Sequence, residues 1–466
     1  MSKRASKPIL LIVAAALLLV AQPVSSQDDI PITDLGPINA PGSPTDINDQ
    51  GQVVGYYDMP EAFGVARFLW VPGKGRLDLP GTGRPLVYLN ERTQVTTNMY
   101  VEDDPYDLQA IVWDGGPPDT LGDLGVPYVI PYDINDAKQV VGEARTETRW
   151  SHAFRWTAEA GIQDLGTLGG LRSSALAINN LGWIVGDSLT ANGENHAFLW
   201  TPTGGMKDLG TLGGDYSRAV DVNELGQGVG TSSTASGVDH AFLWTSEGGM
   251  LDLGTLGGDF SRASDISEAG HVVGLSSNAS GEEHAFLWTP DGGMIDLGTL
   301  GGSWSDAVRV NNSGYVAGTS YLATGAMRGF VWMQGKGMME LVPLPGGTAS
   351  SAVDINHKGQ IAGWTNSDTG ERHAVIWSAA LSPEEQIEQM LETVLQLVSD
   401  GALNQGNANA LTQKLENALK QLQAENTTAA CSQLQAFVSQ VEAYTKTGKL
   451  SQDQGNELID AANSLM

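Results

Sequence analysis

Short apolar runs alternate with turns rich in Gly, Ser, Asn and Asp through most of the chain, and this pattern repeats. The clearest marker of the repeat is a Trp that stands two residues after an apolar residue. It recurs at spacings of 43 to 45 residues, at Trp70, Trp113, Trp156, Trp200, Trp244, Trp288, Trp332 and Trp377. A period of this length indicates one supersecondary unit stacked on copies of itself.

The copy at residues 217–254 shows what one unit contains. Four runs have strand-like composition and are separated by turn residues, which leaves no room for a helix. The runs are 219–223, 227–231, 240–245 and 250–253. Four strands in about 44 residues are typical of a propeller blade, so the predicted fold class is mainly β, an eight-bladed β-propeller. Residues 85–100 lack the Gly-x-Val-Val-Gly pattern, and a seven-bladed ring is the alternative.

The two ends of the repeat region complement each other. The last repeat is one strand short, because the chain changes character directly after Trp377. The strand-like residues 32–36 precede the first repeat and have no partner there. We expect this N-terminal strand to complete the last blade as its outer strand, which would protect sheet edges that otherwise pair with other chains.

Two further segments flank the repeats. Residues 1–26 combine basic residues, an apolar run and a small-residue stretch, which is the pattern of a secretory signal peptide. After residue 380 Trp disappears, and Leu, Gln, Ala and Glu dominate. The predicted domains are a signal peptide at 1–26, a propeller at 27–380 and a four-helix domain at 381–466. The predicted location is secreted or extracellular, the periplasm included.

Capping signals divide the C-terminal segment into four helices. Capping boxes begin at Ser382 and Ser451, and Asn404 and Thr427 or its neighbour begin the two helices between them. Apolar residues recur at helical spacing in each segment, which predicts a small all-α bundle with its own core.

The net charge of the chain limits the classes of ligand that it can bind. The sequence has 25 Lys and Arg against 54 Asp and Glu, a net charge of −29, so nucleic acid is not expected as a ligand. No second apolar segment is long enough to span a membrane in the mature chain. The single Cys431 excludes an intramolecular disulfide, and no cofactor motif is present. The oligomeric state stays open.

Two strings recur nearly unchanged in the middle repeats. Asp-Leu-Gly-Thr-Leu-Gly-Gly begins at Asp164, Asp208, Asp252 and Asp296, and His-Ala-Phe-Leu-Trp begins at His196, His240 and His284. Over about residues 32–378 the chain thereby resembles the extracellular HAF-repeat family of bacteria. The resemblance implies export and a propeller-like repeat, and it brings no catalytic residues. The C-terminal segment is similar to small helical modules of the FIMAH type.

Residues that recur in every repeat are interpreted as structural. A catalytic group normally comes from an irregular constellation, and a buried imidazole needs partners for both of its nitrogens. We therefore expect the repeated His to bind a turn carboxylate or hydroxyl rather than a metal. The structural set is His196, His240, His284, Trp200, Trp244, Trp288, Asp208, Asp252 and Asp296.

Two sets are candidates for binding. Aromatic residues occupy the same position in three successive connections between blades, and a further Trp lies near the end of a second strand. Rings on one rim of a propeller can stack on a ligand. The set is Tyr216, Phe260, Trp304 and Trp364. An acidic cluster in the second repeat is a weak calcium candidate and is more typical of a solvated loop; it comprises Glu102, Asp103, Asp104 and Asp107.

Three functions are compatible with these features. The favoured hypothesis is a secreted, non-enzymatic recognition or scaffold protein, whose propeller face binds an extracellular glycan or protein. An extracellular enzyme that acts on polysaccharide at the propeller channel is the second, and a structural envelope or matrix component is the third. The sequence contains no Gly-x-Ser-x-Gly or His-Glu-x-x-His motif, so enzymatic activity is left open with the balance against it.

Overall fold

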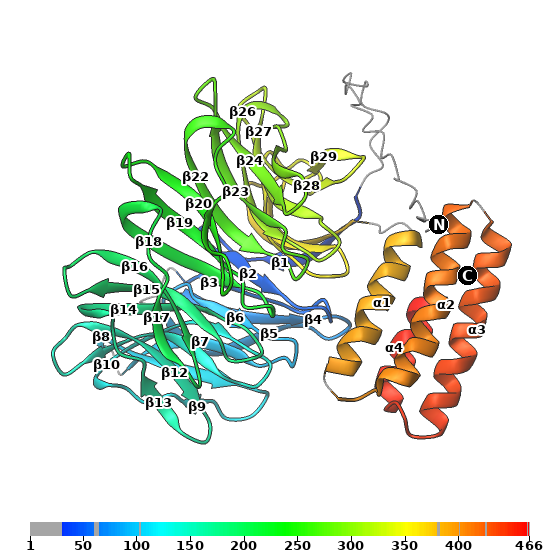
Figure 1. Ribbon diagram of the computed structural model, residues 1–466, viewed down its shortest axis with the longest axis horizontal. Coiled ribbons are helices and arrows are strands. Elements are labelled where there is room, and N and C mark those ends of the chain that lie inside the picture. The colour runs from blue at the N-terminus through cyan, green and yellow to red at the C-terminus, as the bar shows by residue number, and fades with distance from the viewer. Residues whose placement is uncertain are drawn as a thin grey trace, which may run out of the picture.

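The computed structural model describes residues 30–59, 65–101, 104–379, 383–399, 401–424, 426–463 and 465. The predicted signal peptide at 1–26 lies outside these residues. The described part consists of a β-propeller with a helical bundle beside it (Figure 1).

The propeller is built from eight four-stranded units, numbered here in chain order. The first strands are β2 (Ser43–Ile47), β6 (Val87–Leu89), β10 (Gly125–Ile134), β14 (Gly169–Ile178), β18 (Gly213–Val222), β22 (Gly257–Ile266), β26 (Gly301–Val310) and β30 (Ser350–Ile355). The second strands are β3 (Val53–Asp58), β7 (Val95–Val101), β11 (Val140–Thr146), β15 (Ile184–Thr190), β19 (Gly228–Thr234), β23 (Val272–Asn278), β27 (Val316–Leu322) and β31 (Gln360–Asn366).

The outer half of each unit is a second hairpin. The third strands are β4 (Val65–Val71), β8 (Asp104–Trp113), β12 (Ser151–Thr157), β16 (Asn195–Thr201), β20 (Asp239–Thr245), β24 (Glu283–Thr289), β28 (Met327–Met333) and β32 (Arg372–Ser378). The fourth strands are β5 (Gly75–Gly83), β9 (Asp119–Thr120), β13 (Gly161–Asp164), β17 (Gly205–Asp208), β21 (Gly249–Asp252), β25 (Gly293–Asp296), β29 (Gly337–Leu341) and β1 (Ile32–Pro37).

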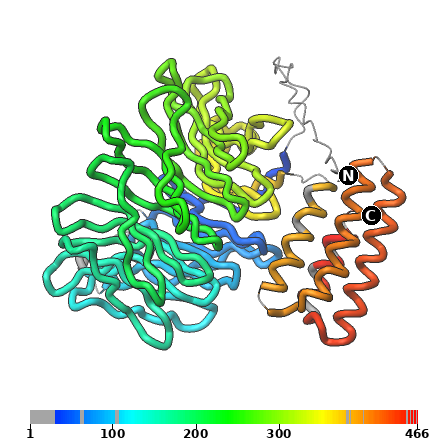
Figure 2. Tube along the Cα trace, in the orientation of Figure 1, coloured from blue at the N-terminus to red at the C-terminus, as the bar shows by residue number. Residues whose placement is uncertain are grey.

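The N-terminal strand belongs to the last unit. β1 pairs antiparallel with β32, from Ile32 opposite Trp377 to Pro37 opposite His373, which confirms the predicted partner of this strand. Figure 2 shows the blue start of the chain beside the yellow strands of the last units. The pairing therefore joins segments more than 300 residues apart in the sequence.

Apolar side chains pack between units rather than within them. Each of eight core clusters combines residues of two consecutive units, and one of them joins unit 8 to unit 1 through Ile376, Ile47 and Phe68. The Phe of the third strand, such as Phe242, is fully buried against the preceding unit. A unit cannot bury this side chain alone, so stacking supplies most of the stability.

Long first strands connect neighbouring units. β18 begins six residues before the predicted start at 219, because its first half crosses from the preceding unit. Single parallel contacts then join units 2 and 3, 4 and 5, and 6 and 7 into three eight-stranded sheets; the contacts are Leu108 with Tyr128, Asn195 with Tyr216 and Glu283 with Trp304. None of the sheets formed by the described residues closes on itself.

The helical bundle contains α1 (Pro383–Ser399), α2 (Gln405–Gln423), α3 (Thr427–Lys446) and α4 (Gln452–Asn463). Asn404 caps α2 as predicted, and the Ser451–Gln454 capping box forms in both directions. α3 is capped by Asn426 instead of Thr427, because an Asn side chain accepts the Ala429 N–H equally well. Ser382, the first predicted cap, lies outside the described residues.

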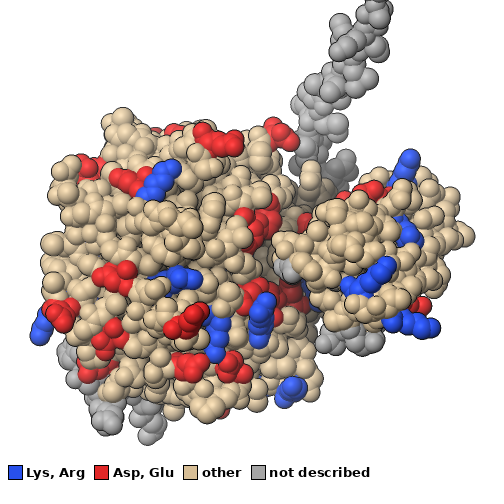
Figure 3. All heavy atoms as spheres, turned by 60° about the horizontal axis from the view of Figure 1, so that its bottom comes forward, with Lys and Arg blue, Asp and Glu red and all other residues tan. Residues whose placement is uncertain are grey.

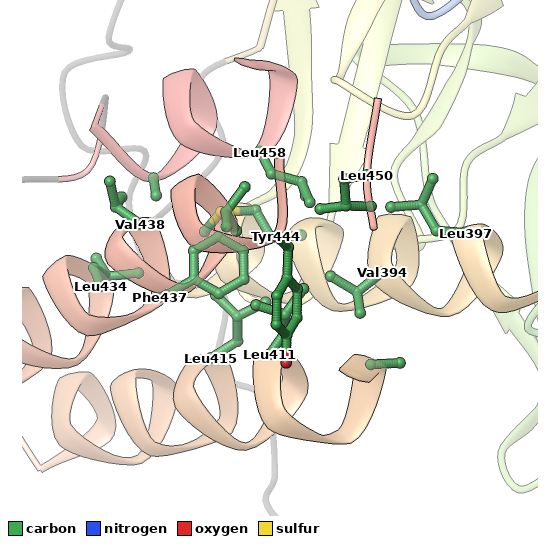
Figure 4. Packing of buried hydrophobic residues seen from close by; sticks show 14 of the residues in the cluster. Val394, Leu397, Leu411, Leu415, Leu434, Phe437, Val438, Tyr444, Leu450 and Leu458 are labelled. Carbon is green, nitrogen blue, oxygen red and sulfur yellow. The ribbon is translucent and has the colours of Figure 1, made fainter. Parts of the chain in front are cut away.

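One apolar core holds the four helices together (Figure 4). Val394 of α1, Leu411 and Leu415 of α2, Phe437 of α3 and Leu458 of α4 are almost completely buried in it. All of them except Phe437 belong to the apolar stripes that the sequence predicts. Among the helices described, none combines the length and apolar character that a bilayer crossing requires.

Candidate functional site at the centre of the propeller

The first strands place a carboxylate at one repeat position in five of the eight units. These residues are Asp46, Asp133, Asp221, Asp265 and Asp354, and Tyr88, Ala177 and Arg309 occupy the same position in the other units. Each Asp accepts a backbone N–H of the following unit at 2.7 to 3.0 Å. The carboxylates therefore link neighbouring units as well as charging the centre.

Arg309 partly balances this charge. Its Nε lies 3.5 Å from Asp354 Oδ1 and 4.0 Å from Asp265 Oδ1. Burial lowers the pKa of Arg309, but the carboxylates outweigh it and raise the pKa above its usual value. Burial raises the pKa of Asp133 to about 6, and burial together with Asp354 raises that of Asp46. Five carboxyl groups therefore share one arginine, and the raised pKa values of Asp46 and Asp265 neutralise part of the negative charge.

A belt of side-chain amides follows at the turn after each first strand. In seven of eight places the described residues show one side-chain amide donating to the backbone carbonyl of the next turn, at 2.8 to 3.2 Å. The last of these bonds runs from Asn356 of unit 8 to Asn48 of unit 1. Ser267 replaces Asn in unit 6, at the one interval where no such bond is found among the described residues.

The next residue of each turn forms a second circle, which we call the mouth ring. Its members are Asp49, Glu91, Asp136, Asn180, Glu224, Glu268, Asn312 and His357. Backbone N–H groups bind the side chain of the following member, for example Asp49 N to Glu91 Oε2 at 3.0 Å and Glu91 N to Asp136 Oδ1 at 3.0 Å. The turns thus hold their carboxylates in fixed positions.

A cavity of about 230 Å³ opens between these turns. Asp46, Glu91, Asp136 and Glu224 supply its acidic lining, and Asn90, Asn135 and Asn179 are among its neutral polar residues. The cavity is therefore polar and negative, and it excludes anionic groups by repulsion.

The mouth ring holds carboxyl groups with very different proton affinities. Partial desolvation, followed by repulsion from Asp49, raises the pKa of Glu91 to about 8. Partial desolvation and Glu224 raise that of Glu268 to about 7. His357 has the opposite effect on Asp49. The Nδ1 of His357 lies 3.0 Å from Asp49 Oδ2 and lowers the pKa of that carboxyl despite desolvation. The same contact raises the pKa of His357 to about 9.

Helix α1 approaches the same ring. The side chain of Glu392 is hydrogen-bonded to that of Asn312, and His357 attracts it, although desolvation raises the pKa of Glu392 overall. Figure 3 shows acidic side chains in the recess between the propeller and the bundle. The helical bundle thus contacts the propeller at the mouth ring.

The predicted structural residues lie elsewhere, on the outer hairpins. His Nδ1 of the third strand is 2.9 to 3.0 Å from a fourth-strand carboxylate in five units: His152 with Asp164, His196 with Asp208, His240 with Asp252, His284 with Asp296 and His373 with Asp34. The Asp also accepts the N–H of the Gly two residues later, as at Gly254. Trp200, Trp244 and Trp288 pack in the clusters between units.

The predicted binding aromatics lie at equivalent positions of successive units, apart from Trp364. Tyr216, Phe260 and Trp304 are half-buried at equivalent positions, and among the described residues no ring contact joins them. Trp304 instead lies beside Tyr321, with ring centroids 5.2 Å apart. Trp364 is in unit 8, beneath the guanidinium of Arg372 at 3.7 Å.

Most of the predicted calcium candidates have side chains that the structure does not describe. Glu102 and Asp103 lie outside the described residues, and the side chain of Asp104 is not described. Within the described part of the chain, no group of three or more His, Cys, Asp or Glu residues has the geometry to hold a metal ion.

Sequence reasoning missed the mouth ring. Each of its carboxylates follows an Asn or Ser in a turn, and such a residue is usually a solvated turn residue. An alignment of the eight repeats with one another could have found it. In that alignment one turn position is acidic in units 1, 2, 3, 5 and 6 and not in the others.

Solved structures with a similar fold are distant in sequence. The β-propeller domain of the Trilobed protease from Pyrococcus furiosus is 10% identical with a TM-score of 0.45, and the match covers 65% of this chain and 98% of that domain. Puromycin hydrolase is 12% identical with a TM-score of 0.45, over 76% of this chain and 61% of that one. Porphyromonas gingivalis dipeptidyl peptidase 4 is 11% identical with a TM-score of 0.43, over 73% and 58%.

These neighbours correct the favoured functional hypothesis. Four of the solved structures of similar fold are peptidases, against the favoured hypothesis of a non-enzymatic recognition or scaffold protein; the likeness itself assigns no activity to this chain. The chain spans only about 56 to 61% of the length of these peptidases, and at such low identity the likeness describes the fold. No curated protein matches the chain. Residues 387–466, which hold most of α1 and all of α2 to α4, match the FIMAH domain.

Proposed function

We propose that the eight units are the blades of one closed, eight-bladed ring of HAF repeats, exported by the N-terminal signal sequence. Three observations support closure: the β1–β32 pairing, the core cluster shared by units 8 and 1, and the amide belt that continues from Asn356 to Asn48. In this arrangement the mouth ring surrounds the axis of the ring, so its carboxylates face a common space.

We further propose that the protein is an acid–base enzyme with its active site at the mouth ring. The observation that carries this proposal is the divergence of two neighbouring carboxyl groups. The pKa of Glu91 is raised to about 8, whereas His357 lowers the pKa of Asp49. At neutral pH one group is protonated and the other is ionised, and environments that separate two pKa values in this way are typical of acid–base pairs.

The chemistry that suits this pair is hydrolysis of an amide or a similar bond. A water oxygen attacks the carbonyl carbon and gives its proton to Asp49, while Glu91 donates its proton to the leaving nitrogen as the C–N bond breaks. The cavity beside Glu91 accepts a neutral or cationic substrate, because Asp136 and Glu224 repel anions. Amides with a free ammonium or a basic side chain are the substrate class that this charge favours.

The experiment is an assay of the full-length protein with chromogenic amides that differ only in charge: lysyl, alanyl and aspartyl derivatives. We expect turnover in the order lysyl, alanyl, aspartyl. Glu91→Gln should lower kcat by about 10² to 10⁴, the range for loss of a general acid. Glu247→Gln, the same change on an exposed outer turn, is the matched control and should leave kcat unchanged. Absence of turnover with every amide, or full activity of Glu91→Gln, would overturn the proposal.

A further inference from the structure

A second cavity lies near the start of β26, at the end of that strand opposite the mouth ring. It has a volume of about 540 Å³ and is formed by unit 7 together with Glu282 of unit 6. Gly301, Gly302 and Ser303 line it from the start of β26, and Tyr321 lines it from β27. The mouth ring follows the end of β26, so the two cavities are separate sites.

An aromatic pair forms one wall of this groove. Tyr321 is 39% exposed, and its ring is 5.2 Å from that of Trp304 at an interplanar angle of 41°. Gly302 provides the adjoining bare backbone, because a Cβ there would lie 2.8 Å from the Tyr321 Cβ and 2.6 Å from its carbonyl oxygen. The glycine is therefore required for the close approach of β26 and β27, as Gly214 and Gly258 are in the two preceding units.

The two preceding units lack this wall. The residue equivalent to Tyr321 is Ser233 in unit 5 and Ser277 in unit 6, as the contacts of Gly214 and Gly258 show. The Ser277 hydroxyl bonds the Phe260 carbonyl within its own unit. Since the fold is satisfied by serine at this position, the tyrosine of unit 7 is not needed to build a unit.

Carboxylates accompany the aromatic wall. Glu282 lines the groove with a side chain that is 47% exposed, and its Oε2 lies 3.8 Å from His284 Nε2. Glu283 is in register with Trp304 across the unit boundary. No lysine or arginine is among the residues that line the groove. Its electrostatic character is therefore that of a cation site.

Other surface rings in this protein already hold an internal cation. Arg372 covers Trp364 at 3.7 Å, Arg145 covers Tyr128 at 3.7 Å and Arg76 covers Tyr57 at 4.0 Å. Among the described residues, no arginine or lysine is found over Trp304 or Tyr321. A planar guanidinium can stack on a ring face and bind a carboxylate at the same time.

We propose that this groove binds an arginine side chain of a peptide or protein, stacked on Tyr321 and paired with Glu282. The site is independent of the proposed amide hydrolysis at the mouth ring. Its ligand class follows from the combination of an aromatic face, an adjacent carboxylate and the absence of a basic lining residue.

The test is calorimetric titration of the full-length protein with N-acetyl-arginine amide at low ionic strength. N-acetyl-citrulline amide, which has nearly the same shape without the charge, should bind at least several-fold more weakly, and added salt should weaken only the arginine ligand. Tyr321→Ser should reduce the affinity about tenfold and Tyr321→Phe should retain it, because the π face is the contact. Glu282→Gln should reduce it several-fold.

Glu194→Gln is the matched control, because Glu194 occupies the position of Glu282 in unit 4, and the following unit has Ser233 where unit 7 has Tyr321. It should bind as the wild type does, and unchanged melting temperatures should confirm that each variant folds. Equal binding of citrulline amide, preferential binding of N-acetylglucosamine, or wild-type affinity in Tyr321→Ser would overturn the proposal. A site at the mouth ring would also be revealed, since its affinity would respond to Glu91→Gln and not to Tyr321→Ser.

Discussion

The outer hairpins and the mouth ring are built on the same repeat, but they use it differently. On the outer hairpins a His–Asp pair recurs in five units with nearly identical distances. In the mouth ring one turn position carries Asp, Glu, Asn or His, although the backbone bonds around it are the same. Identical side chains serve a need that every unit shares, which is folding. Where the side chain varies while the backbone stays the same, folding does not dictate the side chain, and the position can serve a binding or catalytic site.

The largest effect on folding is expected from removal of β1, which forms part of the outer hairpin of unit 8. Deleting Ile32–Pro37 removes a sheet ladder, the Asp34–His373 pair and the cover of β32 in one step. We expect a loss of several kcal/mol in the free energy of unfolding and a strong tendency to aggregate, measured by denaturant titration and light scattering. Addition of a peptide with residues 30–38 should restore solubility. A truncated protein as stable and soluble as the parent would show that β1 does not complete unit 8.

The packing between units gives the next largest effect. Phe242→Ala removes a fully buried ring from the cluster shared by units 4 and 5, and truncations of this kind cost about 3 to 5 kcal/mol. Phe242→Leu should cost clearly less, because more of the volume is retained. Thermal unfolding of both variants checks the order. Equal stability of the Ala variant and the wild type would contradict the assignment of this interface as the main core.

The His–Asp pair should contribute less than the core does. The His240 side chain is 19% exposed and that of Asp252 is 42% exposed, so water replaces part of the lost interaction. We expect His240→Ala to cost about 1 kcal/mol, the usual net contribution of one hydrogen bond. A double-mutant cycle with Asp252→Ala isolates the pair from other losses. Independent, fully additive effects in the cycle would show that the contact has no energetic role.

The repeat fold was predictable because its signals are local and periodic. Trp spacing, turn residues and strand composition indicated the four-stranded unit, and the unmatched residues 32–36 indicated the partner of β32. The mouth ring was not predictable in the same way. Glu91 reads as an ordinary turn residue, and its raised pKa depends on Asp49 and Asp136, which stand 42 and 45 residues away and become neighbours only in the stacked arrangement.

The same dependence explains the groove of unit 7. The position of Tyr321 beside Trp304 follows from the register of β26 and β27. Glu282 reaches the groove from the preceding unit, across the parallel contact between Glu283 and Trp304. A site shared by two units cannot be read from the pattern of one unit.

The last test concerns pH and addresses the mouth ring. The folded-state pKa of Glu91 is about 8, well above the ordinary value of 4.5. Between these two values the folded state binds more protons than the unfolded state, so this group makes stability fall as the pH rises from about 4.5 to about 8. Glu91→Gln removes that loss without removing much volume. The variant should therefore melt at a higher temperature than the wild type at pH 8.5, and the difference should shrink toward pH 4.5. A wild type and a Glu91→Gln variant with parallel melting curves across the whole range would show that Glu91 titrates normally and would remove the basis of the acid–base pair.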